Sequence, residues 1–401
     1  MLTVPFGAAV AAPKPDKEVK AVFEAKRRLI GPGRSPWLVA RRQHGLMMAY
    51  SRQGDLFFQS SNDLGDTFTE PLPINSVAAE VSDHGENGPQ LLSSPGDREL
   101  YAVWNARTPN APGKSDVRFS RSSAMQVAWS PAITVNDGPP ASHNFQGAAV
   151  AADGAIYAGW LDSRDPGGSS VYVTCSTDGG KSFAPNVRVV GNVCPCCRVS
   201  IGTVGNRVVL SWRQVEAGDI RDIFTAVSED HGKTWSQPAL VARDAWKISG
   251  CPHCGPSLAG VGDTLWIAWM SEGGGEPAVY IAQSRDGGRT FSQRVQASGE
   301  TLDPTHPRLA TNGENLALVF QAREAGGEQG WGKFVAWYRE VYPDGSMSAL
   351  QQAPAGDANT SYPSLALGLS GRLFMGWSEL SDGAPHVALL RARAARPPKS
   401  S

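Results

Sequence analysis

The chain has 401 residues, with 37 Lys and Arg against 38 Asp and Glu, so its formal net charge is −1. A charge this close to zero, without a basic run, excludes a nucleic-acid partner bound through counterion release. No stretch approaches 18 consecutive apolar residues, so the sequence predicts no membrane span. The 44 Gly and 29 Pro indicate a turn-rich chain, and closed all-β domains of this length often form one unit.

The N-terminal segment from Met1 to Pro13 is apolar and ends in small residues of the Ala-x-Ala type. It resembles the end of a secretory signal, so we expect export to a periplasm or to the extracellular space. We expect residues 1–18 to be a residual signal or disordered segment, 19–395 to form the folded domain and 396–401 to be a disordered tail. Nothing in the sequence indicates an oligomer, and we expect a monomer.

A short motif, Ser-x-Asp-x-Gly-x-Thr/Ser-Phe/Trp, occurs four times along the chain. Its copies begin at Ser61, Ser176, Ser228 and Ser284. In a tight hairpin turn the Asp side chain can accept bonds from turn amides, while Gly supplies the positive φ that the turn requires. Four copies with matching flanks indicate a repeated structural unit.

A second marker repeats with the same period. Each unit contains an apolar strand that ends in an aromatic residue, and these anchors lie roughly 51 to 57 residues apart. The anchors are Tyr50, Trp104, Trp160, Trp212, Trp269, Phe320 and Trp377. This period is typical of an all-β propeller with one four-stranded blade per unit.

Seven anchors predict a single propeller of seven blades, with six blades as the alternative if one anchor belongs to an insertion. The last unit supplies only three strands. We therefore expect residues 19–25 to add the fourth strand and close the ring, because closure removes exposed sheet edges.

The motifs and their period, over nearly the whole chain, resemble the sialidase-like Asp-box (BNR repeat) superfamily. The resemblance implies a propeller whose Asp-box turns lie on the face opposite the active site. The turns therefore report the fold rather than the chemistry.

The chemistry of a propeller is expected where the innermost strand of each blade begins, since these points converge around the ring axis. About 14 to 20 residues before the anchors, metal-ligand and catalytic residue types recur from unit to unit. They are Arg34; His84, Glu86 and Asn87; His143 and Asn144; Cys194, Cys196 and Cys197; Cys251, His253 and Cys254; Asp303 and His306; and Tyr362.

Two neighbouring units carry related cysteine motifs at this position. One reads Cys194-Pro-Cys-Cys197 and the other Cys251-Pro-His-Cys254. Their offset of 57 residues equals the offset between the aromatic anchors of the two units. The two motifs are therefore predicted to be structurally equivalent and adjacent around the ring.

Paired cysteines at this spacing can place two thiolates on one ion, and soft thiolates with imidazole suit copper or zinc. Five cysteines exceed what one zinc needs, so we favour copper, with zinc as the alternative and with room for more than one ion. The predicted ligands are Cys194, Cys196, Cys197, Cys251, His253 and Cys254, with His84, His143 and His306 as additional candidates. The predicted role is metal sequestration, delivery or a metal-dependent step, with a metal-donating or metal-accepting protein as a possible partner.

Two other uses of the cysteines stay open. Exported proteins oxidise spare thiols, so the motifs can instead form structural disulfides. Cys-Pro-His-Cys also resembles the redox motif of thioredoxin-fold thiol oxidases, although those place it at a helix start.

Glycoside hydrolysis is the enzymatic alternative. The resemblance to sialidases implies an arginine cluster for a carboxylated sugar, a nucleophilic Tyr activated by Glu, and an acidic residue. The candidate positions are Arg34, Asp83, Arg213, Arg308 and Tyr362. The loop where the activating Glu is expected instead carries the first cysteine motif, although Glu86 could supply a carboxylate. A third alternative is a non-catalytic interaction propeller.

Overall fold

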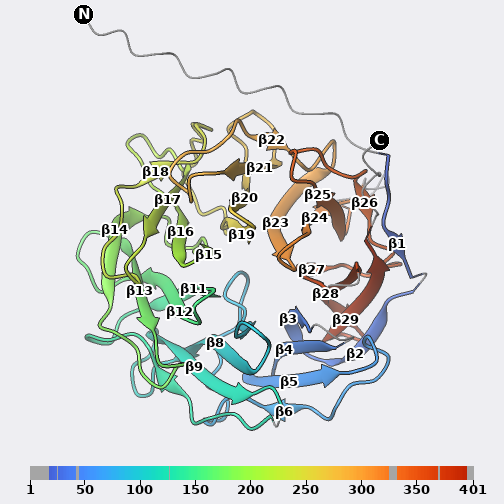
Figure 1. Ribbon diagram of the computed structural model, residues 1–401, viewed down its shortest axis with the longest axis horizontal. Helices are drawn as coiled ribbons and strands as arrows, with labels where there is room; N and C mark the ends of the chain where they lie inside the picture. The colour runs from blue at the N-terminus through green and yellow to red at the C-terminus, as the bar shows by residue number, and fades with distance from the viewer. Residues whose placement is uncertain are drawn as a thin grey trace, which may run out of the picture.

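The computed structural model describes residues 18–24, 26–41, 45–125, 127–324, 332–368 and 371–394. The predicted signal segment up to residue 17 and the predicted tail lie outside these residues. The described chain contains no helix, and hence no helix that is long and apolar enough to cross a membrane. Its strands form seven sheets arranged as a ring, which confirms the seven-bladed propeller (Figure 1).

The strands of each blade follow one another outward from the ring axis. The innermost strands are β3 (Arg34–Ala40), β7 (Gln90–Ser93), β11 (His143–Val150), β15 (Ser200–Val204), β19 (Ser257–Val261), β23 (Leu302–Thr311) and β27 (Ser361–Leu367). The second strands are β4 (Leu46–Arg52), β8 (Glu99–Arg107), β12 (Ile156–Asp162), β16 (Arg207–Arg213), β20 (Thr264–Ser271), β24 (Leu316–Arg323) and β28 (Arg372–Ser381).

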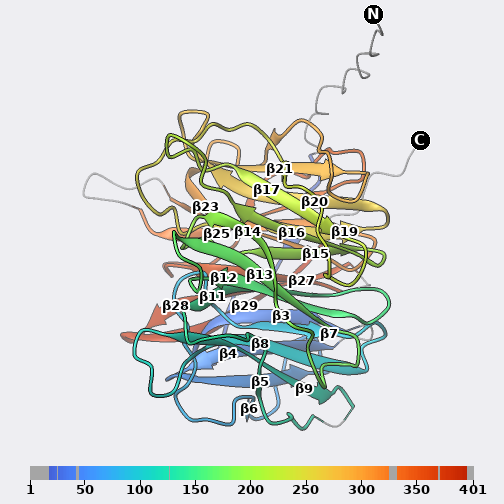
Figure 2. The same ribbon diagram turned by 90° about the vertical axis from the view of Figure 1, so that its left-hand side faces the viewer.

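The third strands are β5 (Asp55–Ser61), β9 (Ser115–Ser123), β13 (Ser169–Ser176), β17 (Ile223–Ser228), β21 (Ala278–Ser284), β25 (Phe334–Val341) and β29 (Ala384–Arg393). The outer strands are β6 (Leu72–Pro73), β10 (Ile133–Thr134), β14 (Val187–Val193), β18 (Ala239–Leu240), β22 (Val295–Gln296) and β26 (Gln351–Gln352). All pairs within these blades are antiparallel, and the strands run between the two faces of the disc (Figure 2).

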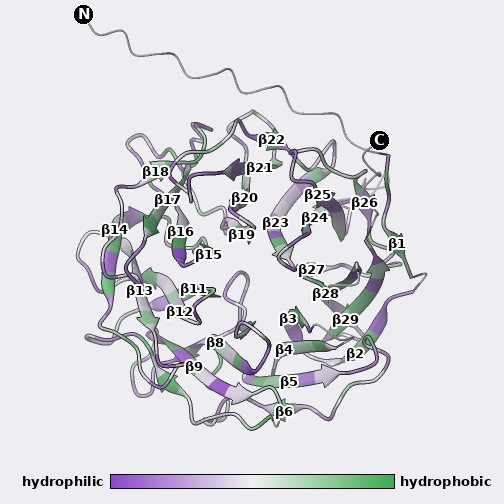
Figure 3. Cartoon of the chain, in the orientation of Figure 1, coloured by the Kyte–Doolittle hydropathy of each residue, from purple (hydrophilic) through white to green (hydrophobic). Residues whose placement is uncertain are grey.

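Every aromatic anchor lies in a second strand, and five of them are tryptophans with no exposed surface. Strands such as β12 are buried along their whole length because each blade packs against two neighbours. Apolar residues therefore occur on both faces of these strands, and Figure 3 shows hydrophobic colour in the blades around the ring. Burying each large side chain contributes about 1.5–3 kcal/mol, so the ring of anchors is a major source of stability.

The ring closes as the sequence predicted. In the seventh blade, Val22 and Phe23 of β1 pair with Arg393 and Ala392 of β29. A second N-terminal strand, β2 (Arg28–Pro32), continues along the same edge. The outer edge of the last blade is thus covered by two short strands from the other end of the chain rather than by one.

The four Asp-box motifs form the turns that follow β5, β13, β17 and β21. In the last of them the Asp286 carboxylate accepts bonds from the Thr290 backbone N–H at 2.9 Å, from the Thr290 hydroxyl at 2.6 Å and from Ser284 at 2.7 Å. Third strands end on the face opposite the one where innermost strands begin. We call the face where innermost strands begin the upper face and the Asp-box face the lower face.

Replacing Asp286 by Ala should lower the free energy of unfolding by about 1 kcal/mol, since solvent partly screens the bonds lost from this turn. Partial burial raises the pKa of Asp286, but the bonds from Thr290 and Ser284 outweigh it and lower the pKa to about 2. The ionised Asp286 carboxylate therefore contributes its full stability above pH 3.8, the ordinary pKa of the group, and this stability is lost as the pH falls through 2. Urea denaturation at pH 7 and at stepwise lower pH measures it. Asp263→Ala, at the exposed β19–β20 turn, should change stability by less than about 0.5 kcal/mol.

Candidate metal centre on the upper face

Several innermost strands start with the same backbone irregularity. Ser35, Phe145, His306 and Tyr362 have positive φ, and at each of them the register with the second strand shifts. Positive φ is uncommon for residues other than Gly, and bulges of this kind re-aim side chains at the rim of a sheet. The first residues of the innermost strands are therefore shaped alike in four of the blades. The segments that precede the innermost strands are here called lead-in loops.

The first cysteine motif forms a compact cluster in the lead-in loop of β15. The Cys194 sulfur lies 3.6 Å from the Cys196 sulfur and 3.5 Å from the Cys197 sulfur, and all three are buried. An ion with tetrahedral bonds of 2.3 Å to sulfur separates its sulfurs by about 3.8 Å. The three thiols therefore already lie close to the spacing that one ion requires.

Positive charge surrounds this cluster. Arg221 donates to the Cys194 sulfur at 3.3 Å. Hydrogen bonds from the Cys196 and Cys197 thiols lower the pKa of Cys194, and the Arg213 guanidinium lowers it further. Burial raises the pKa of Cys197, so the cluster favours one thiolate that accepts from two thiols. Such surroundings offset the negative charge that several thiolates would bring to a metal ion.

A second group joins the two cysteine motifs across neighbouring blades. The ligand atoms of Cys196, Cys251 and His253 lie within 4.8 Å of one another. Cys251 and His253 are exposed, whereas Cys196 is buried. Cys196 belongs to both groups, so the five residues form one continuous donor set that runs from the interior to the surface. We call this set, Cys194, Cys196, Cys197, Cys251 and His253, the thiol cluster.

Cys254 and His306 lie beside each other rather than in either group. The Cys254 sulfur accepts from the His306 backbone N–H at 3.2 Å, and the His306 ring contacts the His253 carbonyl oxygen through Nε2 at 3.0 Å. Burial raises the pKa of Cys254 to about 11 and lowers the pKa of His306. Both residues are buried, and Cys254 belongs to neither group although it directly follows His253 in the sequence.

The other two candidate histidines lie apart from the cysteines. His143 is fully buried, with Nδ1 2.6 Å from the Ser115 carbonyl oxygen and Nε2 3.5 Å from the Asp162 carboxylate. Its contacts are those of a residue that joins the second and third blades. His84 is exposed and stacks edge-on against Phe145 at a ring distance of 6.0 Å.

Glu86 connects three blades at the centre of the upper face. It comes from the lead-in loop of β7, yet its carboxylate accepts from the Gly255 backbone N–H at 2.5 Å and the Arg198 backbone N–H at 3.2 Å. Those two residues directly follow the two cysteine motifs. A side chain at Gly255 would collide with the Arg198 backbone, because its Cβ would lie 2.1 Å from the carbonyl oxygen. Glu86 thus holds both cysteine loops from across the ring axis.

The residues proposed for hydrolysis are only partly assembled. Tyr362 packs edge-on against His306 at 4.7 Å, and burial together with the nearby Glu86 charge raises the pKa of Tyr362. A raised pKa opposes formation of a phenolate nucleophile. Asp83 accepts from Ser35 at 2.8 Å and lies 3.7 Å from the exposed Arg34, so the acid and the first arginine face each other.

The arginines do not gather as a three-membered clamp. Arg213 has 1% of its surface exposed and donates to the backbone oxygens of Arg221, Cys254 and Met270. Its guanidinium is committed to holding the fourth and fifth blades together. Arg308 instead lies against the Trp37 ring at 5.4 Å.

Sequence reasoning missed the role of Arg221, which follows the anchor strand of the fourth blade rather than preceding it. It also assigned no role to Arg198, which directly follows the first cysteine motif. No spacing rule identified either residue, because both reach the site through side-chain length and loop shape.

Comparisons with known proteins support the fold and no closer relationship. No protein-family model matches the chain, and no curated protein matches it. A protein of unknown function from Dyadobacter fermentans superposes with a TM-score of 0.52 at 15% identity, over 95% of this chain and 99% of its own. Polysaccharide lyase Uly1 superposes with a TM-score of 0.55 at 13% identity, over 89% of each chain.

A mutant of Trypanosoma rangeli sialidase that displays trans-sialidase activity is also similar, with a TM-score of 0.52 at 14% identity. The match covers 96% of this chain but 60% of that sialidase. Identities this low show a shared propeller architecture, which sialidases and polysaccharide lyases both use. Membership of the Asp-box superfamily stays a prediction from the sequence motifs.

Replacing Glu86 by Ala should lower the free energy of unfolding by about 2–4 kcal/mol, because two backbone N–H groups near the axis lose a buried charged acceptor. Glu86→Gln, which keeps one acceptor oxygen, should cost less. The same variants should react faster with a thiol reagent at Cys254, since the loops loosen. The control is Glu99→Ala, which removes a half-buried carboxylate at the start of β8 that does not bond to the cysteine loops. A Glu86→Ala protein as stable and as slowly labelled as wild type would contradict the connecting role.

Proposed function

We propose that this propeller binds a soft transition-metal ion, copper in preference to zinc, through the thiol cluster on its upper face. The role is sequestration, delivery or a metal-dependent step in an exported protein. The single observation that carries the proposal is the continuous donor set, in which two three-residue groups share Cys196.

The chemistry of the donor set supports a soft ion. Four thiols and one imidazole converge, and no carboxylate belongs to either group within the described part of the chain. Thiolates prefer Cu(I) and Zn(II) over hard cations such as Mg²⁺ and Ca²⁺, which require oxygen ligands. Cu(I) is favoured over zinc because the buried group offers three sulfurs alone, with Arg221 and Arg213 nearby to offset their charge.

Because the two three-residue groups share the Cys196 sulfur, we expect the thiol cluster to hold at most two metal ions. Cys194, Cys196 and Cys197 form a buried group, while Cys196, Cys251 and His253 form a group that opens to solvent. When bound, metal would supply Lewis acidity or redox chemistry, and the protein would supply the thiolates and their charge balance. The exposed group offers a route by which a partner protein could donate or accept an ion.

Cys254 is a predicted ligand that lies outside both groups. Its sulfur accepts from His306, and its raised pKa favours the thiol over the thiolate. Metal ligation by Cys254 would require it to leave that bond. The Cys254→Ser variant therefore separates the sequence-based ligand set from the narrower thiol cluster.

Protein prepared from its native compartment should contain one or two equivalents of copper or zinc by elemental analysis. Cys196→Ser should weaken metal binding by at least about 100-fold. Replacing a residue that only hydrogen-bonds to a metal ligand already lowers metal affinity about 10- to 100-fold, and Cys196 is itself a proposed ligand. Cys254→Ser should weaken it much less. The matched control is Cys175→Ser, a buried cysteine in β13.

Free-thiol titration tests the competing use of the cysteines. Metal displacement should release four to five titratable thiols with the ion. Absence of metal together with no more than two free thiols would show that the loops are oxidised and would overturn the proposal.

Glycoside hydrolysis is a second candidate, favoured by the presence of Tyr362 within the electrostatic reach of Glu86 and Asp83. The candidate is less well supported because the pKa of Tyr362 is raised and Arg213 is committed to backbone oxygens. The sialidase and lyase neighbours share the fold with this chain at 13–14% identity.

If the protein is a hydrolase, it should cleave a fluorogenic sialoside, and Tyr362→Phe should abolish the cleavage while leaving metal binding intact. The measurement is initial rate of fluorophore release with metal-loaded and metal-free protein. Cleavage lost in Tyr362→Phe but unaffected in Cys196→Ser would move hydrolysis ahead of metal binding.

A further inference from the structure

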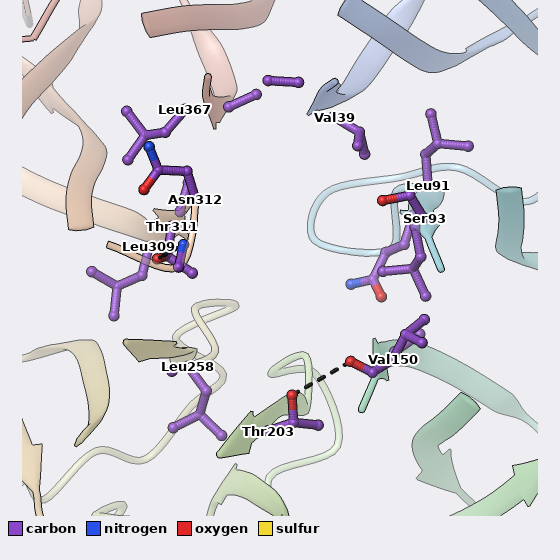
Figure 4. A pocket seen from close by; sticks show the side chains of 18 of the residues that line it. Val39, Leu91, Ser93, Val150, Thr203, Leu258, Leu309, Thr311, Asn312 and Leu367 are labelled. Atoms are coloured by element: carbon purple, nitrogen blue, oxygen red, sulfur yellow. Dashed lines mark hydrogen bonds between the residues drawn. The ribbon is translucent and has the colours of Figure 1, made fainter. Parts of the chain in front are cut away.

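A cavity of about 670 Å³ runs along the ring axis beneath the upper face. All seven innermost strands line it, and Figure 4 shows side chains such as Val39, Leu91, Leu258 and Leu309 around its wall. It extends to the lower face, where the turn between β15 and β16 that contains Gly205 lines it. The cavity lies outside the thiol cluster, and of the residues considered above for hydrolysis only Arg308 lines it.

The upper end of this cavity is lined by Trp37, Arg198 and Arg308. The Arg198 guanidinium carbon lies 5.8 Å from the centre of the Trp37 ring, and that of Arg308 lies 5.4 Å from the same ring. Three different blades supply these side chains. The Trp37 indole stabilises the two guanidinium groups only in part, since a cation over an aromatic face contributes only about 0.5–2 kcal/mol.

Both guanidinium groups have donors without partners. Arg198 has 3% of its surface exposed, and its Nε has no hydrogen-bond acceptor; one terminal nitrogen of Arg308 is likewise buried without an acceptor. Across the described residues no carboxylate lies within 4 Å of either group. The buried Glu86 carboxylate accepts from the backbone N–H groups of Arg198 and Gly255.

A buried cation without a paired anion is costly, and orphaned donors beside an open cavity indicate a ligand that accepts from them. Arginine matches the planar, paired oxygens of carboxylate, sulfate and phosphate better than any other side chain. Water can satisfy a donor but cannot balance the charge. The chemistry that fits both requirements is that of an oxyanion.

We propose that the upper end of the axial cavity binds a small oxyanion between Arg198 and Arg308, beside Trp37. The site shares only Arg308 with the arginine cluster considered for a sugar carboxylate, because Arg34 and Arg213 do not line the cavity. Arg213 is committed to backbone oxygens, and the exposed Arg34 lies beside Asp83. A cavity of about 670 Å³ has room for inorganic oxyanions and for organic acids.

Calorimetric titration of the full chain, kept metal-free and reduced with dithiothreitol, tests the site with inorganic sulfate, phosphate and acetate at constant ionic strength. Saturable binding of at least one anion at one equivalent is expected. Binding of sulfate or phosphate without acetate would identify a tetrahedral ligand, and acetate alone would identify a carboxylate.

Arg198→Gln and Arg308→Gln should each weaken that binding by at least tenfold. Arg188→Gln, which removes an exposed arginine paired with Asp165, should leave it unchanged. Arg308→Gln keeps the test decisive if Arg198→Gln does not fold, because the Arg308 side chain donates no hydrogen bond to the backbone of the described residues and contacts the Trp37 ring instead. Absence of saturable binding for all three anions, or equal affinity in Arg308→Gln and wild type, would overturn the proposal.

Discussion

Pairing of the first strands with the last one is the constraint on which the rest of the molecule depends. β1 and β2 bond to β29, and the link is reinforced inside the seventh blade by Arg27, which donates to the buried Glu379 at 2.7 Å. Glu379 also accepts from the indole of Trp377, the aromatic anchor of that blade. Closing the chain on itself removes the free edge that an open array of blades would leave.

Closure decides the geometry of the upper face. Seven innermost strands around one axis must begin on a common circle, so lead-in loops far apart in sequence come within side-chain reach. Glu86 illustrates the consequence, since it bonds to residues 112 and 169 positions further along the chain. The two cysteine loops owe their relative placement to that contact as well as to the adjacency of their blades.

Charge organises this face in two layers. The thiol cluster brings potential negative charge, and Arg221 and Arg213 lie against it. Nearer the axis, Glu86 is the buried negative charge, while Arg198 and Arg308 bring positive charge to the roof of the cavity. A soft cation among the sulfurs and an anion beside the arginines would each balance charges that the fold holds in place. The two proposals concern different atoms and do not depend on each other.

Much of this protein follows from the sequence by itself. The regular spacing of the aromatic anchors determined the seven blades, because each blade repeats one packing unit, and the shared 57-residue offset determined that the cysteine motifs are neighbours. The tertiary structure alone decided which side chains meet. His253 takes a positive φ, Cys254 turns toward His306, Arg213 bonds across two blades, and Arg221 reaches Cys194. Periodicity fixes where a residue lies along a blade, whereas side-chain direction is set by loop dihedrals and by hydrogen bonds between blades, and these arise only once the ring has closed.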